Sequence, residues 1–191
     1  MEAPEPGRLI VAITGASGAI YGIRALLHLS RLAHVETHLV VTAAARRTIA
    51  QETDWGLAAI VALADHCHHP ADLGAAIASG SFRTRGMLVA PCSVKTLSAI
   101  AHCADGGLVA RAADVCLKER RRVVLMLRET PLHAGHIALM ATATASGAIL
   151  MPPVPAFYHR PATIEDIVDH SIGRALDLFG IDAGIVRRWG E

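Results

Sequence analysis

The stretch Arg8-Leu9-Ile10-Val11-Ala12-Ile13-Thr14, followed at once by Gly15-Ala16-Ser17-Gly18-Ala19, decides the fold of this chain. Its first part is a short apolar run of the kind that forms a strand buried on both faces of a parallel sheet. The glycines predict a tight turn, and residues 20–32 then carry apolar side chains at helical spacing. A strand, a glycine turn and a helix in this order are typical of the first unit of an α/β domain.

Short apolar strands alternate with longer helical patterns along the rest of the chain. We expect strands at 8–14, 36–41, 86–91, 123–127 and 148–151, and helices at 20–32, 43–51, 57–63, 107–119, 136–146 and 164–179. This alternation predicts a single doubly wound, Rossmann-like (flavodoxin-like) α/β domain over residues 8–191, with a parallel sheet flanked by helices. Residues 1–7 are expected to form a flexible tail. In such folds ligands bind beyond the carboxyl ends of the strands.

The composition excludes several classes of protein. The chain has 191 residues, of which 52% are hydrophobic and 18% charged, and its formal net charge is +1. A chain this apolar is not disordered, and it has no net positive field with which to bind nucleic acid by bulk charge. No uncharged apolar run reaches the length of a membrane-spanning helix. Because so few charges are available to cover its surface, we expect a homo-oligomer.

Two strand ends carry residues suited to bind an anion. At the glycine turn, the free N–H groups of the next helix favour a phosphate, with Ser17 as a further donor; the alternative is a tight turn that binds nothing. The turn matches neither the dinucleotide Gly-x-Gly-x-x-Gly motif nor a Walker loop. After the strand at 86–91, Ser93 and Thr96 lie three apart on the first turn of a helix, where they either cap that helix or bind a ligand.

Charged and aromatic residues mark two further candidates. Arg128 ends the apolar strand at 123–127, where a lone cation is costly unless it meets an anion. Glu129 beside it either pairs with it or donates a proton, whereas the charge run at 118–122 is ordinarily a solvated face. The proline-rich loop 152–161 carries Tyr158 in a chain with few aromatic residues, which indicates either a site or simple packing.

Metal binding is not expected from the sequence. The run His66-Cys67-His68-His69 offers ligands, but adjacent residues do not all face one ion in regular structure, and no second half-site is evident. His133 and His136 lack a third ligand at the right spacing. The four cysteines show no paired spacing and no signal peptide precedes them, so we expect reduced thiols in a cytoplasmic protein.

Taken together, the segments resemble the UbiX-type flavin prenyltransferases, a family within the flavin-binding cysteine-decarboxylase-like superfamily. The resemblance covers residues 8–189, and several motifs in one order are more specific than any single one. These motifs are Thr14-Gly15-Ala16-Ser17-Gly18-Ala19, Glu52-Thr53-Asp54, Ser79-Gly80-Ser81, Pro91-Cys92-Ser93 with Thr96, Arg111-Ala112-Ala113-Asp114, Leu117-Lys118-Glu119-Arg120-Arg121, Arg128-Glu129-Thr130-Pro131 and Pro155-Ala156-Phe157-Tyr158-His159.

The resemblance implies an activity and its partners. It implies a transferase that moves a dimethylallyl group from dimethylallyl phosphate to N5 and C6 of reduced FMN. The prenylated FMN would then be the cofactor of UbiD-type decarboxylases. The resemblance also implies a homo-oligomer, a dodecamer in this family, with the flavin near subunit interfaces and with no metal.

The same resemblance implies roles for single residues. For FMN binding it implies Gly15, Ala16, Ser17, Thr42, Ser93, Thr96 and Arg128. For the substrate phosphate it implies Lys118, Glu129, Tyr158 and Arg174, with Arg111 from a neighbouring subunit. The catalytic residues implied are Glu52, near the flavin N5, with Glu129, Ser17, Lys118 and Tyr158, and Trp189 would close the site.

Two other functions fit the sequence less well. Decarboxylases of cysteinyl substrates resemble this fold but carry a histidine after the second strand and an asparagine in a later loop. Those positions here read Ala43-Ala44-Ala45-Arg46 and Ser93-Val94-Lys95-Thr96. A non-catalytic flavin carrier or decarboxylase subunit would have no use for the second anion site that Lys118, Tyr158 and Arg174 imply.

Overall fold

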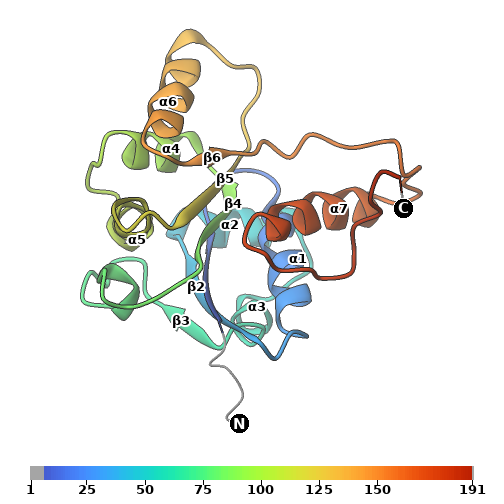
Figure 1. Cartoon of the computed structure of the whole chain (residues 1–191), viewed down its shortest axis with the longest axis horizontal. Helices are drawn as coiled ribbons and strands as arrows, with labels where there is room; N and C mark the ends of the chain where they lie inside the picture. The colour runs from blue at the N-terminus through green and yellow to red at the C-terminus, as the bar shows by residue number, and fades with distance from the viewer. Residues whose placement is uncertain (1–6, 191) are drawn as a thin grey trace.

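The computed structural model describes residues 7–190, and within them six strands form one parallel sheet in the order β3-β2-β1-β4-β5-β6 (Figure 1). Helices connect the strands, which confirms the predicted doubly wound α/β fold. The elements are β1 (Gly7–Ile13), α1 (Ala19–Leu29), β2 (Val35–Val41), α2 (Ala43–Glu52), α3 (Leu57–Val61), β3 (His66–His68), η1 (Ala76–Ala78), β4 (Gly86–Cys92), α4 (Val94–Ala101), α5 (Gly107–Lys118), β5 (Arg122–Leu127), α6 (Ala134–Ala145), β6 (Ile149–Leu150) and α7 (Ile164–Asp177).

The helices cover both faces of the sheet, and β1 shows why. Its side chains alternate, so that Leu9, Val11 and Ile13 join one core cluster while Ile10 and Ala12 join the other. The first cluster packs against α1, α2, α3 and α7, and the second against η1, α4, α5 and α6. Figure 1 shows α5 and α7 on opposite sides of the strands. Because the sheet lies between the two sets of helices, predicted site residues on opposite faces of the sheet cannot contact each other within one chain.

Most element predictions hold, and three of the differences concern the strands. β3 was not predicted, because its three residues, His66 to His68, carry no apolar alternation. Gly7 already begins β1, where its amide donates to the His34 carbonyl at 3.0 Å, so the sheet starts one residue earlier than expected. The rest of the predicted tail, residues 1–6, lies outside the described residues. β6 is shorter than predicted, with two residues.

None of the helices in residues 7–190 has both the length and the apolar character needed to cross a membrane. The strand order reverses between β1 and β4, which are neighbours in the sheet but far apart in the chain. At such a switch point the connections leave in opposite directions and open a crevice beyond the carboxyl ends of the strands. The crevice here lies after Ile13 and Cys92.

Helix α1 lies so close to the sheet that Gly22 is required there. A Cβ on this residue would overlap the Ala90 carbonyl oxygen and lie 2.6 Å from Ile13 Cγ1. We therefore expect Gly22→Ala to lower the free energy of unfolding by about 1–3 kcal/mol, because α1 must move away from β1 and β4. Urea unfolding followed by circular dichroism measures this change.

Gly56→Ala is the matched control, since a Cβ at Gly56 meets no atom within 4 Å and the residue has φ −73°. We expect a change within about 0.5 kcal/mol for this variant. Equal effects of the two substitutions would contradict the close contact between α1 and the sheet.

Candidate functional site

A cavity of about 720 Å³ lies at the switch point of the sheet. Gly15, Thr42 and Ser93 follow the carboxyl ends of β1, β2 and β4, and all three line it. Its volume is within the range of small-molecule and cofactor sites. Of the residues predicted to bind FMN or its substrate, five line this cavity: Gly15, Thr42, Ser93, Thr96 and Glu129.

The amino ends of three helices surround the cavity. Thr42 caps α2 by accepting a hydrogen bond from the Ala45 amide at 3.2 Å. Ser93 caps α4 in the same way, accepting from the Thr96 amide at 3.2 Å, so the capping alternative for this pair is confirmed. α5 begins at Gly107, which also lines the cavity. Helix amino ends carry partial positive charge, so the cavity favours an anion.

Thr14, at the end of β1, holds this arrangement together. It is fully buried, and its Oγ1 donates to the Pro91 carbonyl at 2.7 Å and accepts from the Ser93 amide at 2.9 Å. The contact fixes the start of α4 relative to β1. The sequence alone marks Thr14 only as the end of a strand, because its hydrogen-bond partners lie 77 and 79 residues away in the chain.

Two amides at the glycine turn are not free to bind a phosphate, contrary to the prediction. The Gly18 and Ala19 amides donate to the Glu52 carboxylate at 2.7 and 3.4 Å, so a carboxylate of the chain already occupies the amino end of α1. The prediction of unpaired N–H groups at the start of this helix is therefore wrong for the Gly18 and Ala19 amides. At Gly15, a Cβ would overlap Ala44 Cβ, so this glycine allows α2 to approach the turn.

Three more of the residues predicted to bind FMN lie at this turn but do not line the cavity. Ala16 and Ser17 form the turn itself, and Ser17 is exposed. Arg128 lies beside Gly18, and among residues 7–190 no carboxylate forms an ion pair with its guanidinium. Burial raises the pKa of Tyr21, and the nearby charge of Arg128 partly offsets that rise. Arg128 is thus a cation that an anionic ligand can use.

Glu129 does not pair with Arg128. One of its carboxylate oxygens accepts from the Thr130 amide at 3.0 Å, and the residue lines the cavity. Cys92 lies near the same strand end, but burial raises the pKa of its thiol to about 12. The thiol therefore stays protonated at neutral pH and is not a nucleophile.

A single chain does not bring the predicted phosphate-binding residues together. Arg111 and Lys118 lie on α5, where they pair with Asp114 at 3.0 Å and with Glu119, respectively. Tyr158 and Arg174 lie on the opposite side of the sheet, around α7. The four side chains are all at least partly exposed. Their convergence on one phosphate therefore requires groups from more than one subunit.

Tyr158 is held in place by a histidine that the sequence analysis did not single out. Its hydroxyl lies 2.8 Å from Nε2 of the buried His170 and 3.2 Å from the Arg187 carbonyl. Burial lowers the pKa of His170, and the Tyr158 hydroxyl, which donates to the Arg187 carbonyl, can accept from the His170 Nε2–H. The Trp189 ring packs edge-on against Tyr158, 5.5 Å between centroids, and is 82% exposed. The signal that marks His170 is its position four residues before Arg174 on one helix face.

Comparisons with known proteins agree with this geometry. A family profile described as flavoprotein matches residues 2–175. The flavin prenyltransferase UbiX of Thauera aromatica is 56% identical over 182 residues, which covers 95% of this chain and 93% of that protein. A crystal structure of AnUbiX (PadA1) in complex with FMN and dimethylallyl pyrophosphate has a TM-score of 0.95 and 50% identity, covering 98% of this chain and 99% of that one. A dodecameric FMN-dependent Ubix-like decarboxylase from Escherichia coli O157:H7 has a TM-score of 0.93 and 48% identity, covering 96% and 100%.

The carboxyl-terminal segment that carries Trp189 is docked through Asp177. Both Asp177 oxygens lie 3.0 Å from the Arg188 guanidinium, and this pairing lowers the pKa of Asp177. A lowered carboxyl pKa means that the stabilisation is present at neutral pH and is lost as the pH falls through the folded-state value. We expect Asp177→Asn to release the segment and to speed trypsin cleavage at Arg187 and Arg188 at least severalfold.

Asp182→Asn is the control, because Asp182 is largely exposed and lies 3.7 Å from Arg188. This variant should be cleaved at the wild-type rate, as followed by mass spectrometry of timed digests. Equal cleavage of wild type and Asp177→Asn at pH 7 would show that Asp177 does not dock the segment.

Proposed function

Because this chain belongs to the flavoprotein family, and within it to the UbiX flavin prenyltransferases, we propose that it transfers a dimethylallyl group from dimethylallyl phosphate to N5 and C6 of reduced FMN. The observation that carries the proposal is the convergence of Gly15, Thr42, Ser93 and Thr96 on one cavity. These residues come from separate motifs, and the fold joins them at the switch point of the sheet.

The cavity has the chemical character that FMN requires. Backbone amides and hydroxyls at the starts of α2 and α4 can hold the phosphate, as helix amino ends do elsewhere. Arg128 nearby adds a cation without a carboxylate partner among residues 7–190. A flat apolar ring system also needs small apolar neighbours, and the lining supplies Ala43, Ala44, Val94, Ala99, Val109 and Ala110.

The residues around the leaving phosphate define the proposed mechanism. When bound, reduced FMN supplies the nucleophilic N5 and C6 atoms. Lys118 and Arg174, with Arg111 from a neighbouring subunit, would neutralise the charge that develops on the departing phosphate, without a metal. Tyr158 or Glu129 would donate a proton to that phosphate as its bond to the allyl carbon breaks.

Two carboxylates of the site have separate proposed roles. Glu52 is held at the amino end of α1 by the Gly18 and Ala19 amides, and we assign it the proton at N5. Glu129 lines the cavity from the loop after β5. We further propose that the product leaves for a UbiD-type decarboxylase, which would use prenylated FMN as its cofactor.

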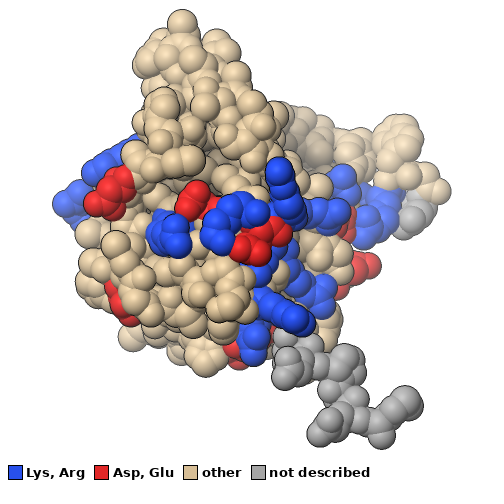
Figure 2. Space-filling view, turned by 60° about the vertical axis from the view of Figure 1, so that its left-hand side comes forward, with Lys and Arg blue, Asp and Glu red and all other residues tan. Residues whose placement is uncertain are grey.

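Assembly of several subunits would complete the site. α6 contains no charged residue, and Figure 2 shows an uncharged lobe that projects above a band of charged side chains. Ile137 on this helix is 58% exposed, and Leu132 just before it is also exposed. Apolar patches of this kind mark subunit contacts. We therefore propose a homo-oligomer, a dodecamer like the Escherichia coli O157:H7 relative.

Glu129→Gln tests the proposed proton donor. We incubate each protein anaerobically with reduced FMN and dimethylallyl phosphate and weigh the flavin by mass spectrometry. Loss of a general acid lowers turnover by about 10²–10⁴-fold, whereas FMN affinity should not change because Gln has the same shape. Glu165→Gln, in the exposed first turn of α7, is the matched control and should keep full activity. Unchanged turnover in Glu129→Gln would refute the role, and no prenylated flavin from the wild type would refute the function.

Ile137→Glu tests the dependence on assembly. Charge on the exposed face of α6 should block subunit contact, so sedimentation should show smaller species and prenyl transfer should fall at least tenfold. Because Ile137 is exposed, circular dichroism should remain that of the folded chain. A dissociated variant with wild-type turnover would show that one subunit holds the whole site.

A further inference from the structure

A carboxylate and three histidines meet at the edge of the sheet, outside the cavity lining. Glu36 and His38 are two residues apart on β2, so both point to the same face. The strand register pairs His38 with His66 on β3, and His68 follows on the same face. His66 lies three residues before His69, which lines the cavity, so at about 3.3 Å per strand residue it is separated from the cavity lining by about 10 Å.

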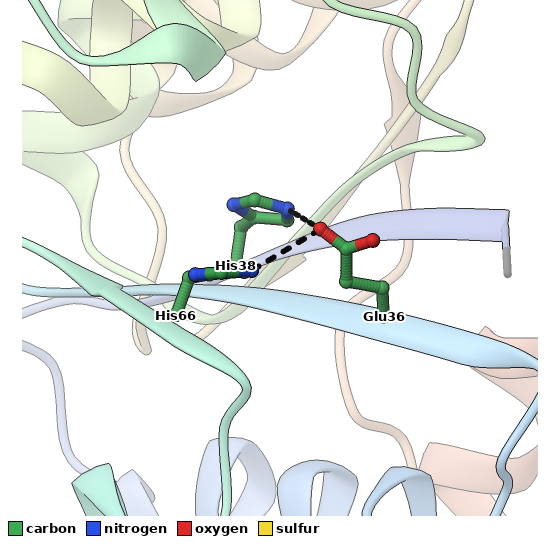
Figure 3. Close-up of side chains that lie close together, drawn as sticks. All are labelled: Glu36, His38 and His66. Atoms are coloured by element: carbon green, nitrogen blue, oxygen red, sulfur yellow. Dashed lines mark hydrogen bonds and ion pairs between the residues drawn. The ribbon is translucent and has the colours of Figure 1, made fainter.

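Three ligand atoms of this cluster converge (Figure 3). Glu36 Oε1 lies 2.9 Å from His38 Nε2 and 3.3 Å from His66 Nε2, and all three atoms lie within 4.8 Å of one another. Two ligands bound to zinc at about 2.0–2.1 Å with tetrahedral angles are about 3.3 Å apart. The observed spacing therefore suits one small divalent cation after minor adjustment.

The surroundings of His38 favour its role as a ligand. The residue is 3% exposed, and its other ring nitrogen, Nδ1, lies 2.9 Å from His68 Nε2. Metal-bound histidines ordinarily make such a hydrogen bond through the second nitrogen, which orients the ring.

Other groups near the cluster leave the space between Glu36, His38 and His66 available to a metal ion. Arg8 Nε lies 3.3 Å from both Glu36 oxygens, and its guanidinium stacks on the Phe82 ring at 4.7 Å, so it makes only long hydrogen bonds to the carboxylate. Cys67 pairs with Leu39 in the register and points to the opposite face of the strand. Without a metal ion, a proton on His38 Nε2 would donate to the same Glu36 oxygen. A metal-free hydrogen bond between His38 and Glu36 therefore competes with metal binding.

We propose that Glu36, His38 and His66 form a binding site for a divalent transition metal of the zinc class, with His68 orienting His38. Imidazole nitrogen and carboxylate oxygen are ligands that Zn²⁺ accepts in proteins, with the fourth position open to water. Such an ion would link the edge strand β3, which has three residues, to β2. The site is separate from the proposed transferase cavity and serves the stability of the sheet edge.

Cobalt titration of the purified full chain tests this proposal. Co²⁺ in a tetrahedral nitrogen and oxygen site gives visible ligand-field bands, and Zn²⁺ should remove them at one ion per chain. We expect His66→Ala and Glu36→Gln to weaken Co²⁺ and Zn²⁺ binding at least about tenfold. Excess Zn²⁺ should also raise the melting temperature of the wild type and not of His66→Ala, because only the folded wild type binds it tightly.

Three controls separate this site from incidental binding. His66 is more than half exposed on an edge strand, so His66→Ala should keep the wild-type circular dichroism spectrum. His34→Ala removes an exposed histidine just before β2, and Cys67→Ser removes the nearby thiol; both should bind Zn²⁺ as the wild type does. The proposal is overturned if the wild type binds no ion, if His66→Ala binds equally well, or if Cys67→Ser abolishes binding.

Discussion

The buried hydroxyl of Thr14 lies where the two halves of the sheet part, and the functional geometry depends on it. At a switch point, β1 and β4 send their connections to opposite faces, which leaves backbone groups at their ends without sheet partners. Thr14 Oγ1 accepts from one of these, the Ser93 amide, and donates to the Pro91 carbonyl, which also accepts from the Thr14 amide at 3.3 Å. Buried polar groups left unpaired are costly, so this one side chain fixes the start of α4 against β1 while the crevice stays open.

The hydrogen-bond partners of the first amides of each helix also determine which helices can bind an anion. α1 follows the glycine turn, but the Glu52 carboxylate already satisfies its first amides, so its partial positive charge is neutralised within the chain. α2 and α4 are capped by uncharged hydroxyls instead, and their amino ends face the cavity. A neutral cap satisfies one amide and leaves the helix dipole to act on a ligand. We therefore propose the anion site at α2 and α4, although the glycine turn is the more conspicuous motif, because at α5 the Gly107 amide donates to the Asp105 carboxylate at 3.1 Å.

The sequence predicts the fold well because its main signals are local. Buried strands such as β1 and β4 show as apolar runs, and the caps Thr42 and Ser93 lie beside the helices that they cap. What it could not predict depends on distant pairing. β3 has no apolar pattern and exists because it pairs with β2, and that register creates the Glu36–His66 contact that a reading of residues 66–69 alone could not find. The motifs also placed Lys118 and Tyr158 in one site without showing that the sheet lies between them.

This separation makes the proposed chemistry dependent on the assembly of subunits. The cavity can be built by one chain, since its lining comes from elements around a single switch point. The cations of α5 and the Tyr158 side chain near α7 lie on opposite sides of the sheet, and a rigid sheet cannot bring them together. Only contact between chains can place the α5 of one subunit near the α7 of another. The uncharged helix α6, which projects from the surface, supplies an apolar area for such contact. The low content of charged residues would therefore favour subunit contact, and that contact would complete the second anion site.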